Sequence, residues 1–127
     1  MAKIASKITG IQHIGIPTAD MQATLAFYEG LGFVREWEDV ERPVVFLRLG
    51  DCVIQTYFLG KTAGQPGAIA YIALNVTDVD AVFDDLLESG YHLLDKGVQY
   101  LPLYRRGVRF FSILGPNGET IAFHQML

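Results

Sequence analysis

The chain has 127 residues, 50% of them hydrophobic and 19% charged, which is typical of one globular domain and excludes a disordered segment. Its 14 acidic residues outnumber the 10 Lys and Arg residues, so the formal charge is −4 and nucleic acid is not an expected partner. No apolar run approaches the roughly 20 residues of a membrane helix, and the N-terminal residues lack the apolar core of a secretory signal. Cys52 is the only cysteine, so no internal disulfide can form. We therefore expect a cytoplasmic protein without a membrane partner, in which Cys52 is a buried structural thiol.

The first half of the chain predicts a strand, a helix and three further strands. Asp20 can cap the helix, which we expect to run to about Glu29 and to end at Gly30 and Gly32. Residues 59–68 are rich in Gly and have no hydrophobic period, so they form the predicted linker. The predicted strands of this half cover residues 8–16, 33–38, 44–49 and 52–58.

The second half repeats this plan. Residues 69–91 align with residues 11–33 without a gap at an offset of about 58, so that His13 falls on Tyr71 and Asp20 on Asp78. Residues 99–106 have no counterpart in the first half, and we expect them to form a flap. The helix after Asp78 is expected to bury a stripe made of Val79, Val82, Phe83, Leu86 and Leu87. The predicted strands of this half cover residues 69–76, 91–94, 108–113 and 120–126.

These elements make two βαβββ modules, at about 8–58 and 69–126, within a single α+β domain. We expect a mostly antiparallel, barrel-like fold with its helices outside and a cavity shared by the two modules. Strand alternation then places one set of side chains on the sheet face opposite the helices. A polar group at the centre of an apolar sheet costs stability unless it is bonded, so the set predicts a site. Its members are His13, Gln55, Tyr71, Ala122 and His124.

Four sequence motifs are shared with one known superfamily. They are Gln-His-Ile-Gly-Ile-Pro at 12–17, Ala-Phe-Tyr before Leu-Gly-Phe within 26–33, Tyr-Ile-Ala-Leu-Asn-Val at 71–76, and the run from Gly107 to Glu119. Over residues 9–126 the chain resembles the vicinal oxygen chelate superfamily, which includes glyoxalase I, bleomycin-resistance proteins and extradiol dioxygenases. The resemblance implies the duplicated βαβββ fold and a homodimer, with the modules paired either within one chain or across the dimer.

The resemblance also implies four metal-ligand positions, on the first, fourth, fifth and eighth strands, where metal-dependent relatives carry His, Glu, His and Glu. This chain has His13, Gln55, Tyr71 and Ala122 at those positions. Ala122 cannot coordinate a metal, and it removes the carboxylate base that glyoxalase-type isomerisation needs. We therefore expect the ancestral metal site to be degenerate. If zinc or nickel binds at all, the expected ligands are His13, Gln55 and His124.

The leading functional hypothesis is a glyoxalase-like or bleomycin-resistance-like protein that binds a small molecule in an aromatic cavity, with no catalytic residue assigned. The alternative is a metal-dependent lyase or isomerase of the glyoxalase I (lactoylglutathione lyase) type with an altered ligand set. An extradiol dioxygenase fits least, because its iron site needs two His and one carboxylate. Arg48 and Arg109 could anchor an anionic ligand, but we expect each to be solvated or salt-bridged. The predicted ligand-binding residues are His13, Trp37, Gln55, Tyr57, Tyr71, Phe111, Ala122 and His124.

Overall fold

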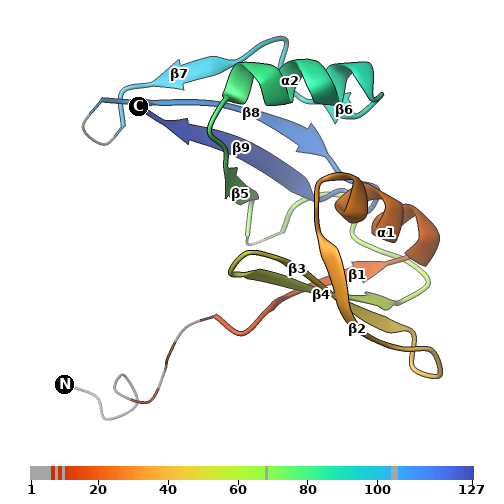
Figure 1. Cartoon of the computed structure of the whole chain (residues 1–127). Coiled ribbons are helices and arrows are strands. Elements are labelled where there is room, and N and C mark those ends of the chain that lie inside the picture. The colour runs from red at the N-terminus through yellow and green to blue at the C-terminus, as the bar shows by residue number, and fades with distance from the viewer. Residues whose placement is uncertain (1–6, 8, 10, 68, 104–105) are drawn as a thin grey trace. The chain divides into compact units, whose positions relative to one another are not determined.

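The computed structural model describes residues 7, 9, 11–67, 69–103 and 106–127 of the chain (Figure 1). The chain divides between Lys61 and Thr62 into two compact units, which we call unit 1 and unit 2. This boundary falls inside the predicted linker at 59–68. Neither described helix is long and apolar enough to cross a membrane.

Unit 1 contains one helix and a four-stranded sheet with the strand order β1-β4-β3-β2. The β1 strand pairs with β4 in parallel, and the other neighbours are antiparallel, so the sheet is mixed and open, with β1 and β2 as its edges. The edge strand β2 has a bulge between Arg35 and Trp37. The elements are β1 (Ile14–Thr18), α1 (Met21–Gly30), β2 (Val34–Asp39), β3 (Val44–Leu49) and β4 (Cys52–Phe58).

Unit 2 repeats this architecture, with the strand order β5-β9-β8-β6 and a parallel pair formed by β5 and β9. Its additional strand, β7, pairs with β8, so residues 99–101 are part of the sheet and the predicted flap is corrected there. Residues 104 and 105 of that predicted flap lie outside the described residues. The elements are β5 (Ile72–Asn75), α2 (Val79–Glu88), β6 (His92–Leu93), β7 (Gln99–Leu101), β8 (Val108–Leu114) and β9 (Thr120–Met126).

The fold class is α+β, as predicted, and the antiparallel expectation holds except for one parallel pair in each sheet. The bounds of β3, β4 and β9 match the predicted ranges. The first strand of each unit is shorter than predicted, because pairing with β4 or β9 begins at Ile14 and at Ile72. Residues 8 and 10, which the prediction included in the first strand, lie outside the described residues.

The helix α1 begins where Asp20 accepts a hydrogen bond from the Ala23 amide at 3.1 Å. It ends before Gly32, whose φ of +106° is a conformation that favours glycine. Leu25 and Tyr28 on its inner side are buried, and the Tyr28 ring contacts the Phe33 ring edge-on at 5.3 Å. These contacts attach α1 to one face of the sheet of unit 1 and leave the other face without a helix.

Three buried threonines lie in the core of unit 1. The hydroxyls of Thr18 and Thr24 are 2.8 Å apart, and Thr18 also accepts a hydrogen bond from the Asp20 amide at 2.9 Å. Thr56 is equally buried, but its hydroxyl has no hydrogen-bond partner among the described residues. An unpaired buried hydroxyl is a cost that the remaining apolar core must offset.

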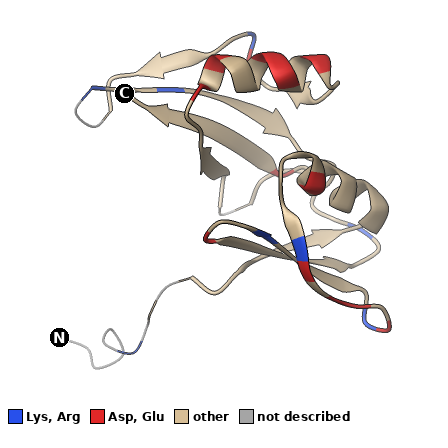
Figure 2. Cartoon of the chain, in the orientation of Figure 1, with Lys and Arg blue, Asp and Glu red and all other residues tan. Residues whose placement is uncertain are grey.

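The helix α2 is fixed to the sheet of unit 2 at its first turn. Asp78 accepts a hydrogen bond from the Ala81 amide at 3.1 Å, and the Gln125 side chain of β9 accepts one from the Val79 amide at 2.8 Å. Val79 and Leu86 are buried, but Leu87 is 57% exposed, so it does not belong to the predicted buried stripe. The exposed side of α2 carries Asp80, Asp84, Asp85 and Glu88 (Figure 2).

The turn between β8 and β9 packs closely against residues that follow the unit boundary. A Cβ atom added to Gly118 would lie 2.0 Å from the carbonyl carbon of Gly64, so no other residue fits there without moving the backbone. Gly118 also has a φ of +86°. The segment around Gly64 is therefore held against the sheet of unit 2.

Candidate functional site

In unit 1, the sheet face that lacks a helix carries an aromatic cluster. Residues directly opposite each other in a strand ladder share a face, and Gln55 lies opposite both Gly15 and Phe46, while Trp37 lies opposite Phe46. Alternation along the chain adds His13, two residues before Gly15, and Tyr57, two residues after Gln55. We call this set the aromatic face of unit 1; its members are His13, Trp37, Phe46, Gln55 and Tyr57.

Phe46 is the centre of this face. Its ring meets the His13 imidazole at 5.6 Å and the Trp37 indole at 6.0 Å between ring centroids, both at steep interplanar angles. Trp37 is 55% exposed, whereas His13, Phe46 and Gln55 are half-buried. Edge-to-face contacts of this kind hold neighbouring rings in place. The face thus presents ordered aromatic surface beside one amide and one imidazole.

The aromatic face of unit 1 also carries polar groups. His13 Nδ1 donates a hydrogen bond to the side-chain oxygen of Gln12. Gly15 has no side chain, and a Cβ there would meet the Tyr57 ring at 3.7 Å, in ordinary contact. The half-buried Gln55 amide, opposite Gly15, can both donate and accept hydrogen bonds.

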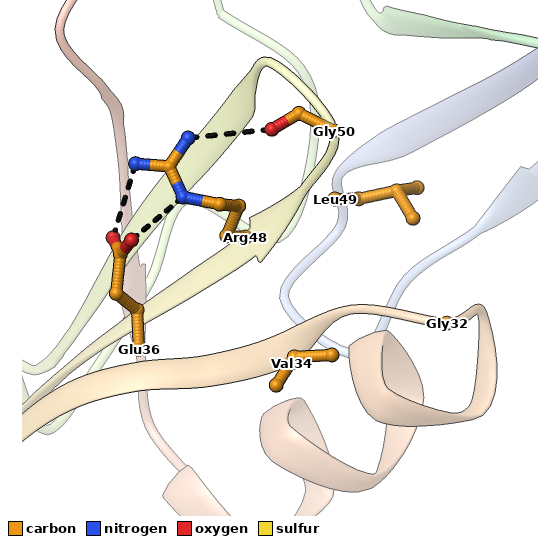
Figure 3. A pocket seen from close by; sticks show the side chains of 6 residues that line it. All are labelled: Gly32, Val34, Glu36, Arg48, Leu49 and Gly50. Atoms are coloured by element: carbon orange, nitrogen blue, oxygen red, sulfur yellow. Dashed lines mark hydrogen bonds and ion pairs between the residues drawn. The ribbon is translucent and has the colours of Figure 1, made fainter.

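A hollow of about 360 Å³ lies between β2, β3 and the adjoining turns of unit 1 (Figure 3). Arg48 donates to both carboxylate oxygens of Glu36, at 2.7 and 3.2 Å, and to the Gly50 carbonyl at 3.3 Å. The hydrogen bond with Glu36 raises the pKa of the Arg48 guanidinium. Arg48 is therefore salt-bridged, as expected from the sequence. The lining residues are Gly32, Val34, Glu36, Arg48, Leu49 and Gly50.

Unit 2 has a smaller face of the same kind. Ala122 lies opposite Ala73 and Ser112, and His124 lies opposite Phe110. The His124 ring is 6.3 Å from Tyr71, nearly parallel to it, and 5.3 Å from Phe110. Tyr71 is 53% exposed, while Ala122 is only 2% exposed. We call this set the aromatic face of unit 2; its members are Tyr71, Phe110, Ala122 and His124.

One predicted ligand-binding residue lies on the wrong side of its sheet. Phe111 is fully buried between Phe83 of α2 and Phe123 of β9, with ring centroids 5.1 and 5.0 Å away. It is therefore a core residue, and its neighbour Phe110 occupies the open face instead. Each side of β8 carries one polar residue, Arg109 beside Phe111 and Ser112 beside Phe110, so alternation in the sequence did not tell the two rings apart.

Phe46 was also missing from the predicted site. Alternation in β3 could have found it, because Val44, Phe46 and Arg48 share a face and Val45 and Leu47 are buried on the other.

Two further sequence predictions are settled by local contacts. Arg109 forms a two-pronged ion pair with Asp80 of α2, at 2.6 and 2.8 Å, so it stabilises the helix and is not free to bind an anion. Cys52 is half-buried where burial had been expected, and this partial burial raises the pKa of its thiol. A raised pKa lowers the thiolate fraction, which argues against a nucleophilic role for Cys52.

The residues at the four implied metal-ligand positions do not form a suitable donor set. His13 and Gln55 in unit 1 supply a neutral imidazole and a neutral amide, while Tyr71 in unit 2 supplies a phenol and Ala122 nothing. None of these groups offers the carboxylate charge that a divalent cation favours. Within the described residues, no three His, Cys, Asp or Glu side chains cluster as metal ligands would. No catalytic step is therefore assigned to a metal here.

The two βαβββ units, each with one sheet face not covered by a helix, make this an α+β protein with a duplicated fold. A comparison of the sequence with protein-family models assigns the chain to one family. It belongs to the Glyoxalase/Bleomycin resistance protein/Dioxygenase superfamily, whose family model matches residues 10–123. The uncharacterized protein YwbC of Bacillus subtilis (strain 168) is 27% identical, with 91% of this chain and 96% of YwbC covered.

Two solved structures share the fold at low sequence identity. A glyoxalase family protein from Enterococcus faecalis has a TM-score of 0.73 and 23% identity, covering 93% of this chain and 98% of that one. The genomically encoded fosfomycin resistance protein FosX from Listeria monocytogenes has a TM-score of 0.76 and 15% identity, covering 94% and 95%. At these identities the likeness establishes the fold alone.

Proposed function

We propose that this chain binds a small organic molecule at its aromatic faces and does so without a divalent metal. The main support is the cluster in which Phe46 contacts both His13 and Trp37, while more than half of the Trp37 side chain stays exposed. Exposed aromatic surface that is held in place can stack on a flat ligand with little loss of side-chain entropy.

The size of the expected interaction follows from the area that a ligand could cover. Removing about 100 Å² of apolar surface from water is worth roughly 2.5 kcal/mol. The Gln55 amide and the His13 imidazole can add directional hydrogen bonds at the same face. These terms together predict a ligand that combines a flat apolar ring with a small polar group.

A metal-dependent lyase of the glyoxalase I type is the rival function. That reaction needs a Lewis acid and a carboxylate base, and Ala122 provides neither at the implied position. We expect no measurable turnover of the hemithioacetal formed by methylglyoxal and glutathione, with or without added zinc or nickel. Robust turnover that disappears in His13→Ala or His124→Ala would replace our proposal with the lyase.

The binding proposal can be tested with 2-naphthol as the probe. Trp37 is the only tryptophan, so the ¹H–¹⁵N spectrum has a single indole peak that reports on the aromatic face of unit 1. We expect this peak to shift saturably, and Phe46→Ala to weaken binding by about tenfold because two ring contacts are lost.

Phe58→Ala is the matched control for Phe46→Ala. Phe58 is an exposed aromatic residue of the same unit, but alternation along β4 places it on the face opposite Gln55 and Tyr57. Its substitution should leave the 2-naphthol affinity unchanged. Equal losses in the two variants, or no saturable shift in the parent protein, would contradict the proposal.

We also propose that the protein forms a homodimer. Exposed apolar side chains around β7 and the end of β9 support this, since exposed apolar surface favours association. Sedimentation equilibrium at micromolar concentration is the test, and a monomer mass would contradict the proposal. The side chains concerned are Tyr100, Leu101, Leu103, Met126 and Leu127.

A further inference from the structure

The charged side chains along the aromatic face of unit 1 suggest which ligands it accepts. Arg48 follows Phe46 by two residues on β3 and therefore shares its face. The spacing between alternate residues of a strand is about 7 Å, so the guanidinium is within reach of a ligand that stacks on Phe46. Arg48 is thus the group that could bind an anionic substituent of such a ligand.

The guanidinium of Arg48 is already ion-paired with Glu36. Both carboxylate oxygens of Glu36 accept hydrogen bonds from the guanidinium, and the Gly50 carbonyl accepts a third (Figure 3). A two-pronged pair of this kind satisfies the planar geometry of both groups. The positive charge is therefore balanced locally, and an anionic ligand would have to compete with Glu36 for it.

The other charged groups near this face supply no free cation. Asp39 lies opposite Val44, which shares a face with Phe46, and hydrogen bonds from the Arg42 backbone and guanidinium lower the pKa of Asp39. It therefore stays ionised at neutral pH. Asp51, in the turn next to Arg48, adds a further carboxylate that interacts with the guanidinium. Asp39 is itself paired with Arg42 at 3.2 Å, so an approaching anion meets two neutralised cations and the further carboxylate of Asp51.

We infer that the aromatic face of unit 1 selects uncharged aromatic compounds over anionic ones, and that Glu36 sets this selectivity by neutralising Arg48. The inference rests on the proposed small-molecule function, and it adds the charge class of the ligand and the residue that determines it. The occupant is a flat ring compound whose polar substituent is neutral, such as a carboxamide that can pair with the Gln55 amide.

The test compares two ligands of the same shape, 2-naphthamide and 2-naphthoate, by titration of the Trp37 indole peak at pH 7.5. The carboxylate is fully ionised at this pH, so the pair differs chiefly in charge. We expect 2-naphthamide to bind at least about tenfold more tightly, because the anion finds no free cation at the face.

Glu36→Gln removes the carboxylate and leaves Arg48 free. We expect this variant to bind 2-naphthoate about fivefold more tightly than the parent does, with little change for 2-naphthamide. Glu38→Gln is the matched control, because it removes the same charge from the same strand while Arg48 stays paired with Glu36. The double variant Glu36→Gln/Arg48→Gln should lose the gain.

The double variant also gives a second reading, because it removes the whole ion pair, whereas Arg48→Gln alone would leave the Glu36 carboxylate unpaired beside the ligand. If Glu36 neutralises Arg48, the double variant binds 2-naphthoate as tightly as the parent protein does. A loss of fivefold or more would show that Arg48 already binds anions in the parent protein and would overturn the inference.

The remaining outcomes are also informative. Equal or tighter binding of 2-naphthoate by the parent protein overturns the charge selectivity while leaving small-molecule binding intact. Saturable binding of neither compound, nor of 2-naphthol, overturns both the inference and the proposed function. A gain in 2-naphthoate affinity for Glu38→Gln equal to that for Glu36→Gln would show a general charge effect and would remove the specific role of Glu36.

Discussion

The two units have one topology and different open faces. The ladders place Ile14 opposite Ile54 in unit 1 and Ile72 opposite Ile121 in unit 2, so these pairs are equivalent positions. With this register, His13 corresponds to Tyr71, Gln55 to Ala122 and Tyr57 to His124. Each face therefore has one imidazole and one phenol, but in exchanged positions.

The difference shows which parts of a duplicated fold are free to change. The core faces are mostly apolar in both units, apart from three buried threonines in unit 1, because each face packs against a helix. The open faces have no such packing requirement, so they can exchange polar and aromatic groups without loss of the fold. Likeness in the core consequently says little about chemistry on the open faces.

The largest expected effect contrasts the equivalent hairpin turns of the two units. Gly118→Ala should destabilise unit 2 by about 3 kcal/mol or more, because the added Cβ meets the Gly64 backbone at 2.0 Å and φ is positive. Gly50→Ala in unit 1 should cost only about 1 kcal/mol, since its φ is +57° but no atom lies within 4 Å of the added Cβ. Urea unfolding of both variants measures the contrast, and equal losses would contradict the close packing at Gly118.

A second experiment adds metal-binding groups to the face of unit 2. Tyr71→His with Ala122→Glu adds an imidazole and a carboxylate beside His124. Because position 122 is only 2% exposed, we expect the unpaired carboxylate to cost about 2–4 kcal/mol without metal. Zinc or nickel should restore much of this loss by binding only the folded state.

The double variant is tested by thermal unfolding with and without metal and by elemental analysis of the purified protein. The parent protein should hold no stoichiometric divalent metal and should show no metal-dependent rise in Tm. One tightly bound ion per parent chain, lost in His13→Ala, would overturn the degenerate-site interpretation.

A smaller effect concerns Thr56, a core position where the units differ in polarity. Thr56 is equivalent to Phe123 by the same register, and its buried hydroxyl has no partner among the described residues. Thr56→Val should therefore stabilise the protein by about 1 kcal/mol. Thr18→Val is the control and should destabilise it by about 1–2 kcal/mol, because Thr18 is hydrogen-bonded to Thr24 and to the Asp20 amide. A loss of stability in Thr56→Val would indicate a partner for this hydroxyl.

The smallest effect concerns the helices. The hydrogen bond from Arg109 lowers the pKa of Asp80 in the first turn of α2, whereas the first turn of α1 has no acidic residue. A lowered folded-state pKa gives stability that is present above the unfolded value near 3.8 and is lost as the pH falls through the folded value. The difference in stability between the parent and Asp80→Asn should therefore shrink below pH 4. A difference that stays constant down to pH 2 would contradict this linkage.

The sequence predicted the elements better than the faces. The repeat and the helix caps at Asp20 and Asp78 are local signals, and the structure has both caps. The pairing of β7 with β8 depends on contacts between segments distant in sequence, and no local sequence pattern predicted it. The choice between Phe110 and Phe111 failed for a related reason, because the ladder partner sets the face and each face of β8 carries one polar residue, Arg109 or Ser112. Alternation along the strands predicted which site residues of one unit share a face, except in β8, where it misplaced Phe111.

The exposed edge strand β2 has a consequence for behaviour at high concentration. A free strand edge can template pairing with another chain, and such pairing leads to fibrils. In β2 the bulge between Arg35 and Trp37 breaks the regular ladder, and Arg35 pairs with Glu29 of α1 and with Glu38 of β2. These features make the edge a poor template for pairing, so we expect the protein to tolerate an exposed tryptophan on this edge strand without forming fibrils.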